Sequence, residues 1–294
     1  MKHFKLMALL SSACCLNQAN AQNYEDLQLV EGYSAKVYYS KGFDERAKDI
    51  TMLTSAAIDY HSALLGFKPS VTVLVLSKDD WNHHTSFPIY GMAHYKDDKT
   101  LVVASSDNDF WKSFIPPLEQ LPGPIASQIK KVYKTKSDSL SMQPFFDLLA
   151  LHELGHAFHM QGGLNMQRKW TGELFCNLFV HTYIAEKEPH LLPALELFPQ
   201  MVVNSGTSGF EYTTLAQLEE NYELIAKEHP RNYGWYQCRW HMAAKNIYDS
   251  GGSNVMVKLW NALKEKKSVA DDKIFADFLL SKVHSAVAAV MQKW

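Results

Sequence analysis

The chain has 294 residues, of which 29 are Lys or Arg and 31 are Asp or Glu, so its formal net charge is −2 at pH 7. Because the basic and acidic side chains are interspersed and form no basic stripe, nucleic-acid binding and attraction to a membrane surface are not expected. The length suits one large domain or two closely packed lobes.

The N-terminus has the pattern of a secretory signal peptide. Basic residues precede an apolar run at 6–16, and the small-residue triplet Ala19-Asn20-Ala21 follows it. The run is too short to span a bilayer, and the triplet places cleavage before Gln22, so 1–21 is the predicted signal and 22–294 the mature chain. We therefore expect a secreted or periplasmic protein with no integral membrane segment after cleavage.

The four cysteines fall into two pairs. Cys14 and Cys15 lie in the signal region, and a lipid anchor there is less favoured, because the residues before them lack the apolar residue that begins a lipidation box. Cys176 and Cys238 remain in the mature chain. Since an exported protein can form disulfides, a bridge between them and two separately buried thiols both stay open.

Strands are expected in the first half of the chain. The run 71–76 is nearly all apolar and β-branched, which suits a strand buried on both faces. His83 and His84 follow in a polar loop and are expected to be solvated, because adjacent side chains point apart. The predicted elements are a strand at 37–39, a helix at 43–65, a strand at 71–76, a strand pair at 90–94 and 100–104, and a short helix at 125–133.

The second half of the chain is predicted to be helical. Pro144 starts a helix that Gly162-Gly163 ends. The next helix is expected to begin around Trp170-Thr171-Gly172, with Thr171 as the candidate cap, and to run to about Glu186. Later helices are expected at 215–227, from 232–238 to 248, at 255–264, and from 273 to the C-terminus.

The helix after Pro144 contains the stretch His152-Glu153-Leu154-Gly155-His156. Residues four apart share one helix face, so both imidazoles can reach a single tetrahedral metal ion. Glu153 flanks that face, where a carboxylate that does not bind the metal can act as general base. The alternative is an ordinary buried helix that carries two hydrogen-bonded histidines.

The following helix carries a carboxylate in an otherwise core-forming sequence. Glu173 and Asn177 share one face, while Leu174, Phe175 and Leu178 supply apolar surface. A buried carboxylate needs a compensating partner, and a zinc ion held by the preceding helix would provide it. The alternative is a first-turn glutamate favoured by the helix dipole.

The two-histidine motif followed seventeen positions later by Glu173 resembles the gluzincin metallopeptidases, the thermolysin-like and aminopeptidase-N-like group. The resemblance implies one zinc ion held by His152, His156 and Glu173, with Glu153 as the base. It also implies an α+β, zincin-like fold, with a mixed sheet and the active-site helix in an N-terminal lobe of about 22–163 and an all-helical C-terminal lobe of 164–294.

A second metallopeptidase pattern does not fit. Metzincins place a glycine three positions and a histidine six positions after the second ligand, whereas this chain has His159 and Gly162 there. His159 shares the ligand face one turn later, and its expected role near the helix end is to stabilise the terminal carbonyls.

The resemblance extends upstream to the strand that pairs with extended substrate. Gly91-Met92-Ala93 is similar to that strand in order and spacing, and so is expected to bind substrate. Family aminopeptidases carry a glutamate there that holds the substrate amine, whereas this chain has His94. That difference favours an endopeptidase.

Downstream, the resemblance implies two supporting roles. Tyr236 begins a helix that reaches Gly251, similar to the stretch in which the family has a tyrosine that stabilises the oxyanion; Tyr233, three residues earlier, is the alternative. Asn177 stands where the family has an acidic residue that orients the first histidine, and its amide oxygen can still accept that N–H.

Together these features predict a secreted zinc-dependent peptidase that hydrolyses peptide or protein substrates. Two other classes stay open. One is a zincin-like protein that grips peptides or glycopeptides without turnover, against which the intact Glu153 counts. The other is a zinc hydrolase of non-peptide amides. The sequence specifies neither the cleavage preference nor the oligomeric state.

Overall fold

The computed structural model describes residues 24–135, 138–265 and 271–294. The predicted signal peptide and the first two cysteines lie outside these residues. The protein is α+β, with a small mixed sheet and many helices. Its described residues form two compact units: a sheet unit of Tyr24–Gly163 and Tyr183–Leu197, and a helical unit of Leu164–Thr182 and Phe198–Trp294. The two-lobe zincin-like arrangement stays a prediction.

A five-stranded sheet organises the sheet unit, in the order β1-β2-β3-β5-β4. β2, β3 and β5 are parallel, and β1 and β4 pair antiparallel at the two edges. β3 and β5 lie inside the sheet, and their apolar runs are almost entirely buried. The strands are β1 (Gln28–Val30), β2 (Lys36–Tyr39), β3 (Thr72–Leu76), β4 (His94–Tyr95) and β5 (Thr100–Ala104).

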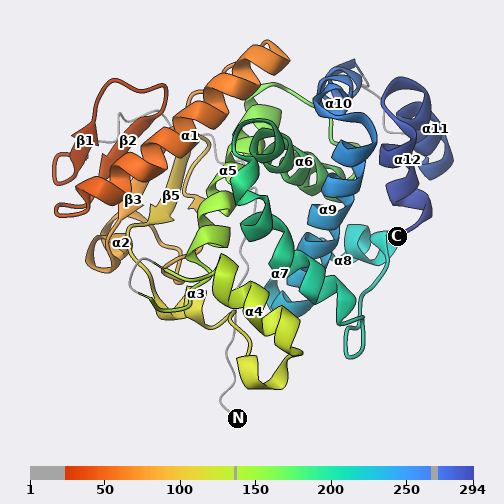
Figure 1. The fold of residues 1–294 in the computed structure, drawn as a ribbon. Coiled ribbons are helices and arrows are strands. Elements are labelled where there is room, and N and C mark those ends of the chain that lie inside the picture. The colour runs from red at the N-terminus through yellow and green to blue at the C-terminus, as the bar shows by residue number, and fades with distance from the viewer. Residues whose placement is uncertain (1–23, 136–137, 266–270) are drawn as a thin grey trace. The chain divides into compact units, whose positions relative to one another are not determined.

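Two long helices pack against this sheet and against each other (Figure 1). They are α1 (Asp44–Leu65) and α5 (Gln143–Gln161), and α5 contains the two-histidine motif. Pro144 lies in the first turn of α5, as predicted. The shorter helices of this unit are α2 (Lys78–His84), α3 (Asp109–Lys112) and α4 (Gly123–Val132).

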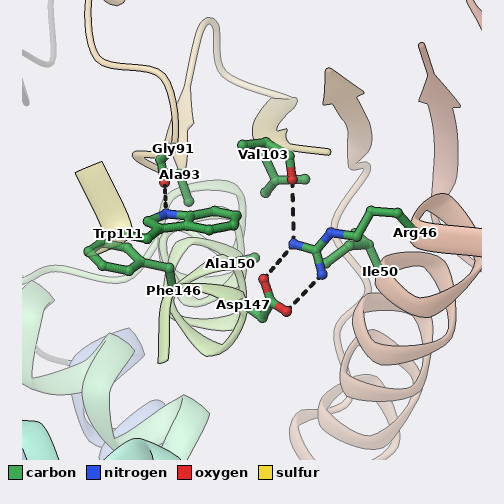
Figure 2. A pocket seen from close by; sticks show the side chains of 10 residues that line it. Arg46, Ile50, Gly91, Ala93, Val103, Trp111, Phe146, Asp147 and Ala150 are labelled. Atoms are coloured by element: carbon green, nitrogen blue, oxygen red, sulfur yellow. Dashed lines mark hydrogen bonds and ion pairs between the residues drawn. The ribbon is translucent and has the colours of Figure 1, made fainter. Parts of the chain in front are cut away.

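An ion pair joins α1 to α5. Figure 2 shows the guanidinium of Arg46 directed at the carboxylate of Asp147, with Nη1 and Oδ2 2.7 Å apart. Nη2 also donates to the Ala104 carbonyl of β5, at 3.4 Å. Trp111 lines the same small pocket as Arg46 and Asp147, and its Nε1 donates to the carbonyl of Gly91 at 2.7 Å. Arg46 thus joins α1 to both α5 and the sheet through polar contacts.

Two local predictions in the sheet unit are wrong. His83 and His84 lie in α2 rather than in a loop, because Ser77 caps that helix by accepting a hydrogen bond from the Asp80 amide. The strand predicted at 90–94 is shorter, and β4 begins only at His94.

The helical unit is built from α-helices. α8 and α9 pack together, and α9 also contacts α10 and α12. The helices are α6 (Lys169–Lys187) and α7 (Leu192–Asn204), which both continue into the sheet unit, then α8 (Leu215–Glu228), α9 (Pro230–Gly251), α10 (Ser253–Glu265), α11 (Asp272–Lys282) and α12 (Ser285–Gln292). Among the described residues, no helix combines the length and hydrophobicity that a membrane crossing needs.

Two predictions in this unit are also wrong. Thr171 does not cap α6, which begins at Lys169, close to the predicted start; the amide of Lys169 donates to the carboxylate of Glu219 from α8 at 2.8 Å. The single C-terminal helix is two helices, because Val283 departs from helical geometry and the side chain of His284 caps α12.

Candidate metal centre

The sheet unit supplies a pair of adjacent imidazoles. His152 and His156 lie one turn apart on α5, with ring centroids 5.1 Å apart and ring planes 71° apart. His152 is buried and His156 half-buried. The two rings therefore lie side by side on one face of the helix, as their spacing predicts.

His156 has a polar partner one turn later on the same helix. Its Nδ1 lies 2.9 Å from Nε2 of His159. When Nδ1 carries the proton and donates to His159, the lone pair of His156 is on Nε2, the nitrogen that can bind a metal ion. The expected role of His159 at the helix end did not include this contact, although the three-residue spacing was visible in the sequence.

Glu153 follows His152 directly on α5 and is 8% exposed. A carboxylate held so far from solvent on the helix that carries the imidazoles has the position that the motif assigns to a base. Its catalytic role stays a prediction.

The helical unit holds the carboxylate of Glu173 at both oxygens. Oε1 accepts a hydrogen bond of 2.8 Å from the hydroxyl of Tyr222, and Oε2 accepts one of 2.8 Å from Nε2 of Gln237. Tyr233 completes a ring, because its hydroxyl lies 3.0 Å from that of Tyr222 and accepts from Nε2 of Gln237 at 2.9 Å. Glu173 is only 4% exposed.

The hydrogen bonds to Glu173 suit its ionised form, because both oxygens accept from neutral donors. The one hydrogen of the Tyr222 hydroxyl goes to Glu173, so Tyr233 is the donor in its bond to Tyr222. Tyr233 also accepts from the amide of Gln237. Burial and the negative charge of Glu173 both raise the pKa of Tyr222 well above its usual value, so this phenol stays protonated.

Cysteine adds a third type of ligand atom. Among the described residues, His152, His156 and Cys176 make up a group that could hold a metal ion, and the predicted ligand Glu173 is not part of that group. Cys176 lies three residues after Glu173 on α6, which puts both side chains on the same helix face. Cys176 and Cys238 are both buried and are not joined by a disulfide, so the structure has the separate thiols of the two alternatives. No family model, curated protein or solved structure matches the chain.

Asn177 is fully buried on the same helix. Its Nδ2 donates to the Glu173 carbonyl at 2.9 Å and contacts Oε1 of Gln237 at 3.4 Å. Its Oδ1 has no hydrogen-bond partner among the residues that the structure describes. The acceptor needed to orient a histidine is therefore available, and the orienting role stays a prediction.

The predicted oxyanion donors have partners within the helical unit. The hydroxyl of Tyr236 donates to the carbonyl of Thr214 at 2.8 Å, and its ring stacks on Trp294 at an interplanar angle of 12°. The hydroxyl of Tyr233 belongs to the ring around Glu173. Spacing alone did not reveal these partners, so neither tyrosine is singled out as an oxyanion donor by its geometry.

The predicted substrate segment uses its own carbonyls internally. The carbonyl of Gly91 accepts from Trp111, and that of Met92 lies 2.9 Å from Nδ1 of His94. Ala93 is buried. The edge strand that pairs with β5 is β4, which begins at His94, after this segment.

His94 is a buried neutral histidine. Nε2 lies 2.7 Å from the hydroxyl of Thr85, and the ring stacks on Phe87 with centroids 4.5 Å apart. Burial lowers the pKa of His94 to about 4. It therefore carries no charge at neutral pH.

Proposed function

We propose that this protein is a zinc metallopeptidase of the gluzincin type, exported from the cytoplasm, which hydrolyses internal bonds of extended peptides. Two observations support the proposal: the adjacent imidazoles on α5, and the carboxylate of Glu173 on α6, which two neutral donors orient. Two neutral nitrogens and one anionic oxygen suit zinc at a site with one position left open.

The chemistry of the donors supports this choice of metal. Tyr222 and Gln237 are neutral, so they orient Glu173 without cancelling its charge. The contact between His156 and His159 supports the tautomer that leaves Nε2 of His156 available to a metal. His152, His156 and Glu173 would hold the ion.

Bound zinc would supply a Lewis acid that activates water and polarises the scissile carbonyl. Glu153 takes the proton from the attacking water and returns it to the leaving amine.

The local chemistry of His94 supports cleavage inside a chain rather than at its free end. A free N-terminus is positively charged and needs an anionic partner in the site. His94 occupies the position of the family's amine-binding glutamate, and it is neutral and engaged with Thr85 and Met92.

Cys176 supports a second candidate function. A thiolate one turn after Glu173 can fill the position that a hydrolase leaves open, and a fully occupied tetrahedron is typical of structural zinc. In that case the protein would bind zinc for stability, and any peptide binding would not lead to hydrolysis.

Metal analysis combined with substitution separates the two functions. For the peptidase, Cys176→Ala should retain about one zinc per chain and its hydrolytic activity. For the closed site, Cys176→Ala should lose zinc and unfold more easily, while the wild type should cleave no peptide. An unstructured protein mixture, with the product termini sequenced, is the appropriate substrate.

A further inference from the structure

Two other helices of the helical unit fix the orientation of Glu173. Tyr222 comes from α8 and Gln237 from α9, and each donates to a different oxygen of the carboxylate, both at 2.8 Å. We propose that Tyr222 and Gln237 are positioning residues that preorganise Glu173 for metal binding. This inference rests on the proposed function, in which Glu173 is a zinc ligand.

Tyr233 makes the two donors a single unit. Its hydroxyl bonds to that of Tyr222 at 3.0 Å and accepts from Gln237 at 2.9 Å, so the four side chains form a closed ring. Because the one hydrogen of Tyr222 goes to Glu173, Tyr233 supplies the hydrogen between the two phenols. In this arrangement both hydrogens that border the carboxylate point at Glu173.

The ring leaves ligand capacity on the carboxylate. A carboxylate offers about four lone-pair directions, and the two donors occupy one on each oxygen. Because both oxygens are held, the group cannot rotate about its terminal bond without breaking a buried hydrogen bond. A ligand fixed in this way loses less conformational freedom when it binds a metal ion.

The neutrality of the donors matters as much as their position. A lysine or arginine in place of Gln237 would hold Glu173 equally well but would compete with the metal ion for its charge. The phenol and the amide orient the oxygens and leave the charge for the metal. The same arrangement stabilises the anion in the buried interior, where an ionised carboxylate without donors would be costly.

Zinc affinity, measured by competition with a chelator on the full-length protein, tests the proposal. Tyr222→Phe and Gln237→Met each remove one donor with little change in shape, and each should weaken zinc binding by about 10- to 100-fold. Tyr133→Phe is the matched control, because Tyr133 is also buried and donates to a backbone carbonyl, that of Ala194, at 3.0 Å. It should bind zinc as the wild type does.

A double-mutant cycle separates positioning from a general structural role. In a Glu173→Gln background, Tyr222→Phe should cause little further loss of affinity, since the carboxylate that it orients is gone. An undiminished further loss would show that Tyr222 acts through the fold and would overturn the proposal. The absorption spectrum of the cobalt-substituted protein gives an independent readout, and Tyr222→Phe should change it while Tyr133→Phe should not.

The outcomes for Glu173 itself keep the two hypotheses apart. Undiminished zinc affinity in Glu173→Gln would remove this residue from the ligand set and overturn the proposed function as stated. Weakened affinity in Glu173→Gln, with wild-type affinity in both Tyr222→Phe and Gln237→Met, would overturn the positioning role alone.

Discussion

Nδ1 of His156 lies 2.9 Å from Nε2 of His159, so one candidate ligand is held by another histidine on the same helix. Replacing His159 by leucine removes the acceptor and should lower zinc affinity by about 10- to 100-fold. His159→Gln is the matched control, because its amide oxygen can still accept a hydrogen bond from Nδ1 of His156. Chelator competition measures both variants, and equal affinities would show that the contact does not orient His156.

Tyr236→Phe distinguishes the oxyanion role predicted from the sequence from the structural role that the observed hydrogen bond indicates. The hydroxyl of Tyr236 donates to the carbonyl of Thr214, so its removal should lower the free energy of unfolding by about 1 kcal/mol. Turnover should stay within a few-fold of the wild type. Denaturant unfolding and steady-state kinetics measure the two effects. A fall in kcat of about 10²–10³ with normal stability would instead identify Tyr236 as the oxyanion donor.

Acid should destabilise the protein through two buried histidines. Burial lowers the pKa of His94 and His181 to about 4, whereas histidine in an unfolded chain titrates near about 6.5. Between these values the unfolded chain binds protons that the folded chain does not. The free energy of unfolding should therefore fall as pH is lowered through this window, by about 1.4 kcal/mol per pH unit for each histidine.

The slope of stability against pH checks this assignment. His94→Gln should remove one histidine's share of the slope. Denaturant unfolding at several pH values between about 4 and 6.5 gives the slope. A wild-type slope in His94→Gln would contradict the buried neutral state.

Removing one partner of the ion pair between α1 and α5 should destabilise the protein more than replacing both partners with apolar residues. Asp147→Asn leaves the mostly buried guanidinium of Arg46 without its counter-charge and should cost about 3 kcal/mol of unfolding free energy. The double replacement Arg46→Met with Asp147→Leu should cost less, because no charge is left buried. If the double variant were the less stable of the two, the attachment of α5 would depend on the ion pair itself.

The sequence predicted the elements whose ends are determined by their own residues. Pro144 and the glycines after Gln161 located α5, and the apolar runs of β3 and β5 located the inner strands. The sequence missed features that depend on distant residues. The carboxylate that accepts from the first amide of α6 is that of Glu219, which lies 50 residues after Lys169.

The same distinction applies to the candidate site. Spacing within one helix placed the two imidazoles together, as the ring separation of His152 and His156 shows. The donors to Glu173 could not be predicted in this way, because Gln237 is 64 residues away and lies on another helix. The partner of Tyr236 was missed for the same reason, since a hydroxyl reaching a carbonyl on a distant segment leaves no local pattern.

The most direct test of the account is the hydrolysis of an unstructured protein by zinc-loaded wild type and by Glu153→Gln. The substitution keeps the size of the side chain and the ligand residues, so both proteins should retain about one zinc per chain. The account predicts internal cleavage by the wild type and a rate lower by about 10²–10⁴ in the variant, because the proton acceptor is lost. Wild-type turnover in Glu153→Gln, with zinc bound, would contradict it.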